Sequence, residues 1–245
     1  MLTFVTFNID LIEKEIQGIQ QVMVGFEHYP AHALIWTLFA SAKRFHPDCR
    51  TVLLTDQTST YPDLDCEIIR YPLDRNTLTL SRTRAQLEFL KNGTEASHLL
   101  FLDTDMLVQS RLEDIFTCDF DVALTARPHN MPINGGLIMI KAFHYNQALL
   151  FMSQLLAHME LKPPPFKKWF GSQLAFKDML ALTSMPDEEG DTVIYQSIRL
   201  LILPCDTYNF SPHLEAPQPY PHKRIVHFKG PRKPLQVPYY EKYLA

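Results

Sequence analysis

Apolar and polar residues in the first part of the chain form blocks that predict strands and helices in alternation. Residues 21–26 and 51–55 are short apolar runs of the kind typical of buried strands. Between them, apolar residues recur three and four positions apart and predict one buried helix face, made of Ile35, Leu38, Phe39, Ala42 and Phe45. Pro47 ends this helix, because proline cannot continue it.

The same alternation continues beyond the second strand. Cys66–Arg70 predicts a third strand, and Ser81 is expected to cap the helix that follows it. That helix leads to an apolar run, His98–Leu102, which predicts another strand. Ser110 and Glu113 have the spacing of a capping box and predict a short helix.

Repeated strand–helix–strand units predict an α/β fold with a mostly parallel central sheet and helices on both faces. Ligands of such sheets bind beyond the carboxyl ends of the strands, where Gly25, Asp56 and Asp103 are expected. Met1–Phe7 predicts a further strand and Asp10–Gln20 a helix, but the pattern gives neither of them a place in the sheet. Because 12 of the 18 prolines lie beyond residue 160, we expect the last third to consist mainly of loops.

Composition and charge limit the function classes. With 46% hydrophobic and 20% charged residues the chain is typical of a globular protein, and its formal charge of −4 gives no general attraction to nucleic acid, so we expect no nucleic-acid partner. The four cysteines are scattered, no apolar stretch is long enough to cross a membrane, and no signal peptide is recognisable. These features predict a cytoplasmic location. The aromatic tail, residues 237–243, allows at most weak peripheral membrane contact.

Two carboxylates, Asp103 and Asp105, directly follow the apolar run at 98–102. Residues two apart on a strand point the same way, so both carboxylates can bind one divalent cation. His227 ends a second apolar run and offers an imidazole nitrogen. Two oxygens and one nitrogen suit Mn²⁺ better than Mg²⁺ and leave coordination positions open for phosphate oxygens. Taken singly, each of the three residues could equally be a structural polar residue.

A basic loop follows His227. Lys229, Arg232 and Lys233 surround Gly230, and such a loop can bring cationic side chains and backbone amides onto phosphate. A solvated charged turn is the alternative.

A third segment, Asn134-Gly135-Gly136, opens an apolar strand. The amide of Asn134 can bind hydroxyl groups, and the two glycines permit close approach of a ligand to the backbone. A plain β-turn is equally compatible with these residues.

These segments occur in the order of a known family. The chain resembles the retaining GT-A glycosyltransferases of family 8, the group of glycogenin and the bacterial lipopolysaccharide galactosyl- and glucosyltransferases. The matching segments are Val24–Tyr29, Arg82 with Arg84, Leu102–Asp105, Ile133–Leu137, Gly171–Gln173, Tyr208–Asn209 and His227–Pro234. The last of them, His-Phe-x-Gly-x-x-Lys-Pro, is the most specific. The resemblance implies one GT-A domain over residues 1–245, in which the N-terminal half binds a nucleotide sugar and the loop-rich C-terminal third forms the acceptor side.

The resemblance also implies roles for individual residues. Asp103, Asp105 and His227 would hold Mn²⁺ or Mg²⁺, and Gln173 would lie near the anomeric carbon, which makes Asp103, Asp105 and Gln173 the catalytic candidates. Donor contacts are implied for Gly25, Glu27 and Tyr29 at the base, for Arg82, Arg84, Asn134 and Gly135 at the sugar, and for Lys233 at the diphosphate.

Together these features predict an enzyme, a hexosyltransferase. It would move a sugar from a UDP-linked donor to a hydroxyl of a glycan, a lipid-linked acceptor or a protein, with retention at the anomeric carbon. The family has Asp-Gln-Asp where this chain has Ser172–Leu174. We therefore favour a front-face mechanism, in which the leaving phosphate helps to deprotonate the acceptor, over double displacement.

Three other function classes stay open. A haloacid-dehalogenase-type phosphatase also has a strand followed by Asp-x-Asp, but here Gly190–Asp191 lacks the later acid of its second motif. A sugar nucleotidyltransferase needs a glycine-rich loop after its first strand, which this sequence lacks. A non-catalytic sugar-nucleotide or glycan-binding homologue would account for the missing carboxylates around Gln173.

Overall fold

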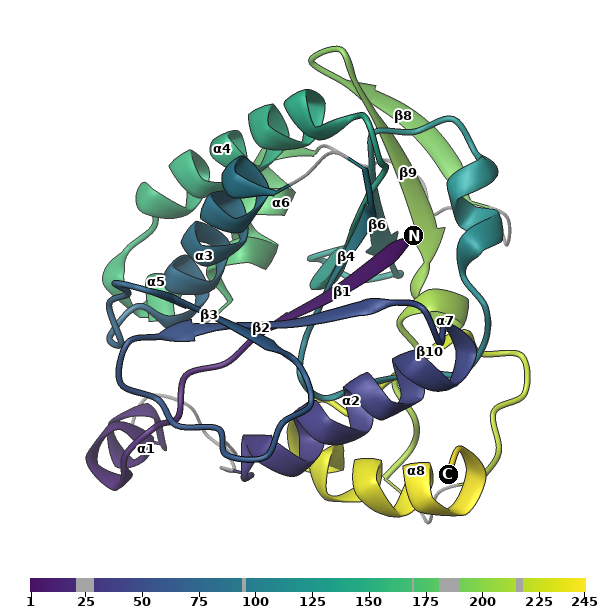
Figure 1. Ribbon diagram of the computed structural model, residues 1–245. Coiled ribbons are helices and arrows are strands. Elements are labelled where there is room, and N and C mark those ends of the chain that lie inside the picture. The colour runs from purple at the N-terminus through teal and green to yellow at the C-terminus, as the bar shows by residue number, and fades with distance from the viewer. Residues whose placement is uncertain (21–28, 94–95, 169, 181–189, 215–217) are drawn as a thin grey trace.

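A central eight-stranded sheet organises the protein (Figure 1). A computed structural model describes residues 1–20, 29–93, 96–168, 170–180, 190–214 and 218–245. The strand expected at residues 21–26 lies outside the described residues. The strands of the sheet are β1 Leu2–Phe7, β2 Arg50–Asp56, β3 Glu67–Tyr71, β4 His98–Leu102, β6 Val122–Ala126, β7 Ile133–Ile140, β8 Asp191–Tyr195 and β9 Ile198–Pro204. A small second sheet pairs β5 Met106–Val108 with β10 Ile225–His227.

The order of the strands is β3-β2-β1-β4-β7-β6-β9-β8. The pairs β3–β2, β2–β1, β1–β4 and β6–β9 are parallel, whereas β7 runs antiparallel to β4 and β6, and β8 runs antiparallel to β9. The predicted mostly parallel sheet is confirmed. The N-terminal strand is an interior strand, third in this order, where Val5 pairs with Val52 on one side and Phe101 on the other.

Helices cover both faces of the sheet, as predicted (Figure 1). The helices are α1 Glu13–Gln20, α2 Ala31–Phe45, α3 Leu78–Asn92, α4 Tyr145–Glu160, α5 Pro164–Lys168, α6 Gly171–Met179, α7 Cys205–Tyr208 and α8 Gln236–Tyr243, with 3₁₀ turns at Glu113–Thr117 and Gly230–Leu235. Neighbouring strand residues point to opposite faces. Accordingly, Val5 joins the core under α3, α4 and α6, and Phe4 joins the core under α2.

Two predicted helix starts are wrong. Helix α3 begins at Leu78, so Ser81 lies inside its first turn, where Ser81 Oγ donates to the backbone oxygen of Asp74 at 2.7 Å. The segment Glu113–Thr117 is a 3₁₀ turn without a side-chain cap. Instead of forming a capping box, Glu113 accepts a hydrogen bond from the neighbouring backbone N–H of Leu112 at 3.1 Å.

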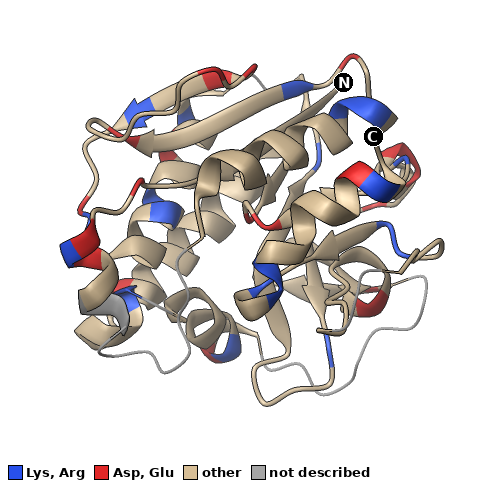
Figure 2. Cartoon of the chain, turned by 90° about the horizontal axis from the view of Figure 1, so that it is seen from below, with Lys and Arg blue, Asp and Glu red and all other residues tan. Residues whose placement is uncertain are grey.

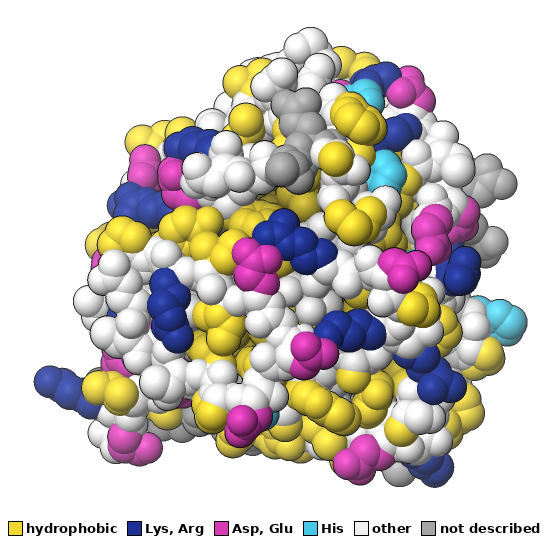
Figure 3. Space-filling view, viewed as in Figure 1, with side chains coloured by type: hydrophobic (Ala, Val, Ile, Leu, Met, Phe, Trp, Pro, Cys, Tyr) yellow, Lys and Arg dark blue, Asp and Glu magenta, His cyan; other side chains and the backbone are white. Residues whose placement is uncertain are grey.

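The surface is mixed in character. In the view of Figure 2, basic and acidic residues are interspersed around the periphery. On the face of Figure 3, hydrophobic side chains are exposed where Figure 1 places α2 and α8. There the 46% exposed Trp36 packs edge-on against Tyr240, with 5.4 Å between the ring centroids. Among the described residues, no helix combines the length and apolarity that a membrane crossing requires.

Candidate active site

A cavity of about 470 Å³ lies at the edge of the sheet where β1 and β4 end. Its walls include residues 7–10 at the end of β1 and beyond it, residues 103–105 after β4, residues 134–136 of β7 and residues 229–233 of the basic loop, together with the start of α6. The ligand site expected beyond the carboxyl ends of the strands thus coincides with a real cavity.

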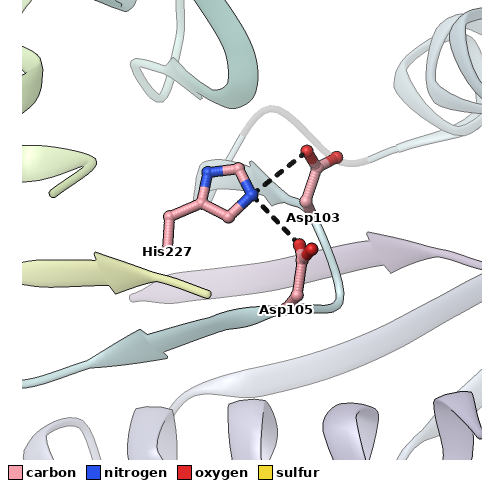
Figure 4. A group of neighbouring side chains, drawn as sticks. All are labelled: Asp103, Asp105 and His227. Atoms are coloured by element: carbon pink, nitrogen blue, oxygen red, sulfur yellow. Dashed lines mark hydrogen bonds and ion pairs between the residues drawn. The ribbon is translucent and has the colours of Figure 1, made fainter. Parts of the chain in front are cut away.

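The three predicted metal ligands converge in this cavity. His227 Nε2 lies 3.1 Å from Asp105 Oδ1 and 3.8 Å from Asp103 Oδ2, and Figure 4 shows the ring turned toward both carboxylates. One atom from each residue lies within 4.8 Å of the others. The reason for the convergence differs from the prediction. The carboxylates do not share a strand face, because β4 ends at Leu102 and residues 104–105 form the turn into β5.

Hydrogen bonds behind His227 fix its tautomer. Thr125 Oγ1 donates to the backbone oxygen of Asn134 at 3.3 Å, so it accepts from Asn209 Nδ2 at 2.8 Å. Asn209 then presents Oδ1 to His227 Nδ1 at 2.8 Å, and Nδ1 carries the proton. The lone pair of Nε2 therefore faces two carboxylates. Three electron-rich groups in this arrangement fit a bound cation, with Asn209 as the partner that orients the histidine ligand.

Gly136 makes room for the cluster. A Cβ atom at this position would lie 2.7 Å from Asp103 Oδ2 and 2.8 Å from His227 Cε1, which is closer than non-bonded atoms approach. A Cβ atom on Gly135 would lie 3.1 Å from Ser172 Oγ, which is also tight. Both glycines lie inside β7. They are therefore explained by close approach and not by a β-turn.

Positive charge surrounds Asp105. Burial raises the pKa of this carboxyl, but its neighbours His227 and Lys233 outweigh burial and hold the pKa below its ordinary value. Lys233 Nζ lies 3.6 Å from Asp105 Oδ2. In the same loop, burial and the positive charge of Arg127 lower the pKa of Lys229 to about 8. Asp105 thus stays ionised, as a cation ligand must.

Of the two arginines expected at the donor sugar, the structure brings only Arg82 into the cavity. Arg82 Nη1 donates to Asp103 Oδ1 at 2.5 Å, and Nη2 donates to Ser172 Oγ at 3.1 Å. Arg84 instead forms an exposed ion pair with Glu160 at 2.7 Å, between α3 and α4. Arg82 therefore links the candidate metal ligands to the start of α6.

Two buried donors in the site have no partner among the described residues. Asn134 is 3% exposed, and its Oδ1 accepts from the backbone of Gly136 at 3.1 Å, but its Nδ2 has no hydrogen-bond partner. Arg82 Nε is likewise unpaired. Buried donors without partners are rare in folded proteins, and a polar ligand bound at this site could satisfy them. Gln173 and Tyr29 also line the cavity.

The segment at the end of β1 is a part of the site that the sequence did not predict. Phe7 to Asp10 line the cavity, and Asn8 Nδ2 donates to Tyr61 Oη at 2.6 Å. The resemblance implies a base pocket lined by Gly25, Glu27 and Tyr29, of which Gly25 and Glu27 lie outside the described residues and Tyr29 lines the cavity. The available signal was the same as at Asp103, namely polar residues directly after an apolar strand.

Asp56, expected at the ligand edge, has a structural partner instead. Its carboxylate accepts from Arg75 Nη1 at 2.5 Å, and Arg75 also pairs with Glu15 of α1 at 2.8 Å. Asp56 does not line the cavity. It ties the end of β2 to the loop before α3.

Comparisons with known proteins identify the fold. No family model matches the sequence, and a search among curated proteins finds no match. Among solved structures, the chain is similar to the glycosyltransferase GlyE of Streptococcus pneumoniae TIGR4, with 15% identity, a TM-score of 0.59 and coverage of 99% of this chain and 60% of that chain. It is also similar to a glycosyltransferase involved in glycosylation of the major capsid of PBCV-1, with 11% identity, a TM-score of 0.54 and 98% coverage of both chains. A third neighbour is the bifunctional glycosyltransferase WbbM, with 11% identity, a TM-score of 0.54 and coverage of 94% of this chain and 46% of that chain.

The fold is therefore that of GT-A glycosyltransferases, which confirms the fold class expected from the sequence. The chain spans 60% of the length of GlyE and 46% of the length of WbbM. At these identities the likeness shows the fold alone, because one fold can host different functions.

Proposed function

We propose that this protein is a metal-dependent hexosyltransferase that moves a sugar from a UDP-linked donor to a hydroxyl acceptor with retention. The observation that carries the proposal is the convergence of Asp103, Asp105 and the free nitrogen of His227 in a cavity on a glycosyltransferase fold. Lys233, 3.6 Å from Asp105, adds the cation that a diphosphate needs.

Asp103, Asp105 and His227 would hold the ion, for which a mixed oxygen and nitrogen set favours Mn²⁺ over Mg²⁺. When bound, the metal stabilises the negative charge that develops on the leaving diphosphate. Lys233 would contact the same diphosphate.

The unpaired donors Asn134 Nδ2 and Arg82 Nε, with Gly135 beside them, support binding of the donor sugar. Tyr29 would contact the base, as would Gly25 and Glu27 on the resemblance alone. Gln173, at the start of α6, would lie near the anomeric carbon.

In the transfer step, the bond between the anomeric carbon and the diphosphate oxygen breaks, and a bond to the acceptor oxygen forms. The acidic residues in the described cavity lining are Asp10, Asp103 and Asp105. Asp103 and Asp105 are candidate metal ligands, and Asp10 belongs to the segment after β1 and not to the start of α6. We therefore assign none of the three as a nucleophile beside Gln173. A front-face reaction, in which the acceptor proton passes to the leaving phosphate, fits this lining. The result is retention.

The proposal extends to the organisation of the chain. The N-terminal half would bind the donor, and the C-terminal third would form the acceptor side of one domain. The acceptor would be a hydroxyl of a glycan, a lipid-linked molecule or a protein. Cys49, Cys66, Cys118 and Cys205 are free thiols, which supports a cytoplasmic location.

The test is thermal unfolding with Mn²⁺ and a panel of UDP-, GDP- and CMP-sugars, with EDTA as the control. A ligand at 100 times its Kd adds about 2.7 kcal/mol, which raises the Tm of a domain of this size by roughly 5–10 °C. We expect this shift with a UDP-sugar only when metal is present. A well-folded sample that shifts with no combination would contradict the proposal.

A separate assay distinguishes the alternatives. A transferase releases UDP over time, whereas a non-catalytic binding homologue shows the thermal shift without release. The phosphatase alternative lacks structural support, because Asp191 lies on the edge strand β8 and is not part of the cavity.

A further inference from the structure

Three cationic side chains lie near the candidate metal ligands. Lys229 and Arg232 line the cavity, and the positive charge of Arg127, which lies outside the described lining, acts on Lys229. Arg127 follows the end of β6, and Lys229 follows the end of β10 in extended backbone. Thr125 and His227, each two residues earlier, are joined through the side chain of Asn209. Residues two apart in extended chain point the same way, so Arg127 and Lys229 continue outward from this buried connection.

No acidic side chain of the described residues forms an ion pair with any of these three cations. Arg127 Nε is buried and finds no hydrogen-bond partner in the described part of the chain. Arg232 Nε donates to a neutral group, the backbone oxygen of Pro212, at 2.5 Å. The positive charges of Arg127 and Arg232 both act on Lys229, and the nearby carboxylate of Asp105 is already shared by His227 and Lys233. Like charges gathered in this way favour an anion among them.

The cluster lies on one particular side of the candidate metal ligands. Along the sheet, the order is β1, β4, β7, β6 and β9. We assign the nucleoside end to the cavity wall that follows β1. The metal ligands follow β4 and Arg127 follows β6, so Arg127 lies on the other side of the metal ligands from the nucleoside end. A nucleotide sugar carries its nucleoside and its sugar at opposite ends of the diphosphate. The cation cluster is therefore on the sugar side, from which an acceptor approaches.

The sequence pattern points the same way. In His-Phe-x-Gly-x-x-Lys-Pro, Lys229 and Arg232 occupy positions that the pattern leaves open, and both line the cavity. They add to Lys233, which alone can serve the diphosphate. The extra cations are features of this chain that donor binding does not require.

We propose that Arg127, Lys229 and Arg232 bind an anionic group of the acceptor, a phosphate or a carboxylate, and that the enzyme thereby selects acidic over neutral acceptors. This inference rests on the proposed function and names the acceptor class of the same site. Guanidinium groups bind phosphate and carboxylate through paired hydrogen bonds, and the lysine adds a point charge.

The test measures binding of three sugar probes to the full chain saturated with UDP and Mn²⁺, so that Lys233 and the metal ligands are occupied. The probes are glucose 6-phosphate, glucuronate and neutral methyl glucoside, measured by calorimetry. We expect at least one acidic probe to bind about tenfold more tightly than methyl glucoside, as charge-assisted hydrogen bonds predict. Tighter binding of glucose 6-phosphate would identify phosphate as the preferred group, and tighter binding of glucuronate would identify carboxylate.

Arg127→Gln is the deciding variant because Arg127 lies outside the donor machinery. It should remove most of the tenfold preference while the affinity for UDP with Mn²⁺ stays unchanged, and Arg127→Lys should restore part of the preference. Arg44→Gln on α2 removes the same charge at an exposed position and should have no effect.

Two results would overturn the inference and leave the proposed function standing. One is equal affinity of wild type for acidic and neutral probes despite tight UDP binding. The other is an equal loss of the preference for acidic probes in Arg44→Gln and Arg127→Gln. Failure of UDP with Mn²⁺ to bind at all would remove the proposed function itself, and the inference with it.

Discussion

Two clusters with the same residue types occupy opposite ends of the same sheet. At the amino ends of β6 and β9, Asp121 is joined to His144 and Arg199. At the carboxyl end of β4, Asp105 is joined to His227 and Lys233. Each cluster consists of a buried aspartate, a histidine and a cation. Residue types alone therefore do not tell a structural cluster from a functional one.

The difference lies in how far the hydrogen bonds are satisfied. Asp121 is 1% exposed and accepts from the backbone N–H of Arg199 at 2.7 Å, from Arg199 Nη2 at 2.7 Å and from His144 Nδ1 at 2.6 Å. Asp105 has one carboxylate oxygen 3.1 Å from His227 Nε2, which carries no proton to donate, and the other 3.6 Å from Lys233 Nζ. It lies beside a cavity in which described donors are unpaired. The first cluster stabilises the fold, and the second is prepared for a ligand.

The largest expected effect tests the structural cluster. Asp121→Ala leaves Arg199 and His144 without their buried partner and should cost about 3–5 kcal/mol, which lowers Tm by roughly 6–20 °C. Turnover per folded molecule should not change. Asp119→Ala removes an exposed partner of the same arginine and should lower the free energy of unfolding by at most about 1 kcal/mol. Equal losses of stability in the two variants, measured by urea unfolding, would show that the Asp121 cluster does not stabilise the fold.

Gly136→Ala tests the functional cluster. The added methyl group meets Asp103 and His227 at 2.7 and 2.8 Å and should lower kcat/KM for the donor at least about a hundredfold, equivalent to about 2.7 kcal/mol. The matched control is Gly93→Ala, whose Cβ would be 3.2 Å from its nearest neighbour and distant from the cavity lining. Full activity of Gly136→Ala would show that Asp103 and His227 do not act as a unit.

Two arginines on α3 sharpen the assignment of the donor site. Arg82→Gln removes the charged hydrogen bond to Asp103 and should lower kcat/KM for the donor about 10- to 100-fold. Arg84→Gln removes only an exposed ion pair with Glu160 and should change kcat/KM for the donor less than about twofold. The reverse ranking in steady-state assays would favour the assignment of Arg84 to the donor sugar.

The smallest effect is a pH dependence outside the cavity. Burial, helped by the positive charge of Lys141, lowers the pKa of His98 to about 4. The unfolded chain, with a histidine pKa near 6.5, then binds a proton that the folded chain does not, so the free energy of unfolding falls as pH drops from 6.5 toward 4. At pH 5 we expect a loss of about 1 kcal/mol, allowing for partial exposure. Urea unfolding of His98→Gln should show a smaller loss between pH 7 and pH 5.

Local pattern was enough for the parts of the fold that depend on local sequence. Strands β2 and β4 were predicted because burial on both faces makes them continuous apolar runs. The candidate metal ligands were found because each follows or ends such a run. The interior place of β1 could not be predicted, because strand order depends on pairings between residues distant in the chain.

The contacts between side chains likewise could not be predicted from the sequence. Arg82 and Arg84 are two residues apart on one helix, and only the packing of α3 decides which of them enters the cavity. The role of Asn209 depends on its contacts with Thr125 and His227. These three residues belong to three separate segments of the chain. Turn geometry, and not strand alternation, brings Asp103 to Asp105.

The most direct test of the central claim is calorimetric titration of Mn²⁺ into UDP-saturated protein, wild type and Asp105→Asn. We expect one Mn²⁺ ion per wild-type chain. In the variant the affinity for Mn²⁺ should fall at least about a hundredfold, since a ligand is lost and the negative charge of the site falls. Equal Mn²⁺ affinity in both proteins, or UDP binding that does not respond to metal, would contradict the central claim.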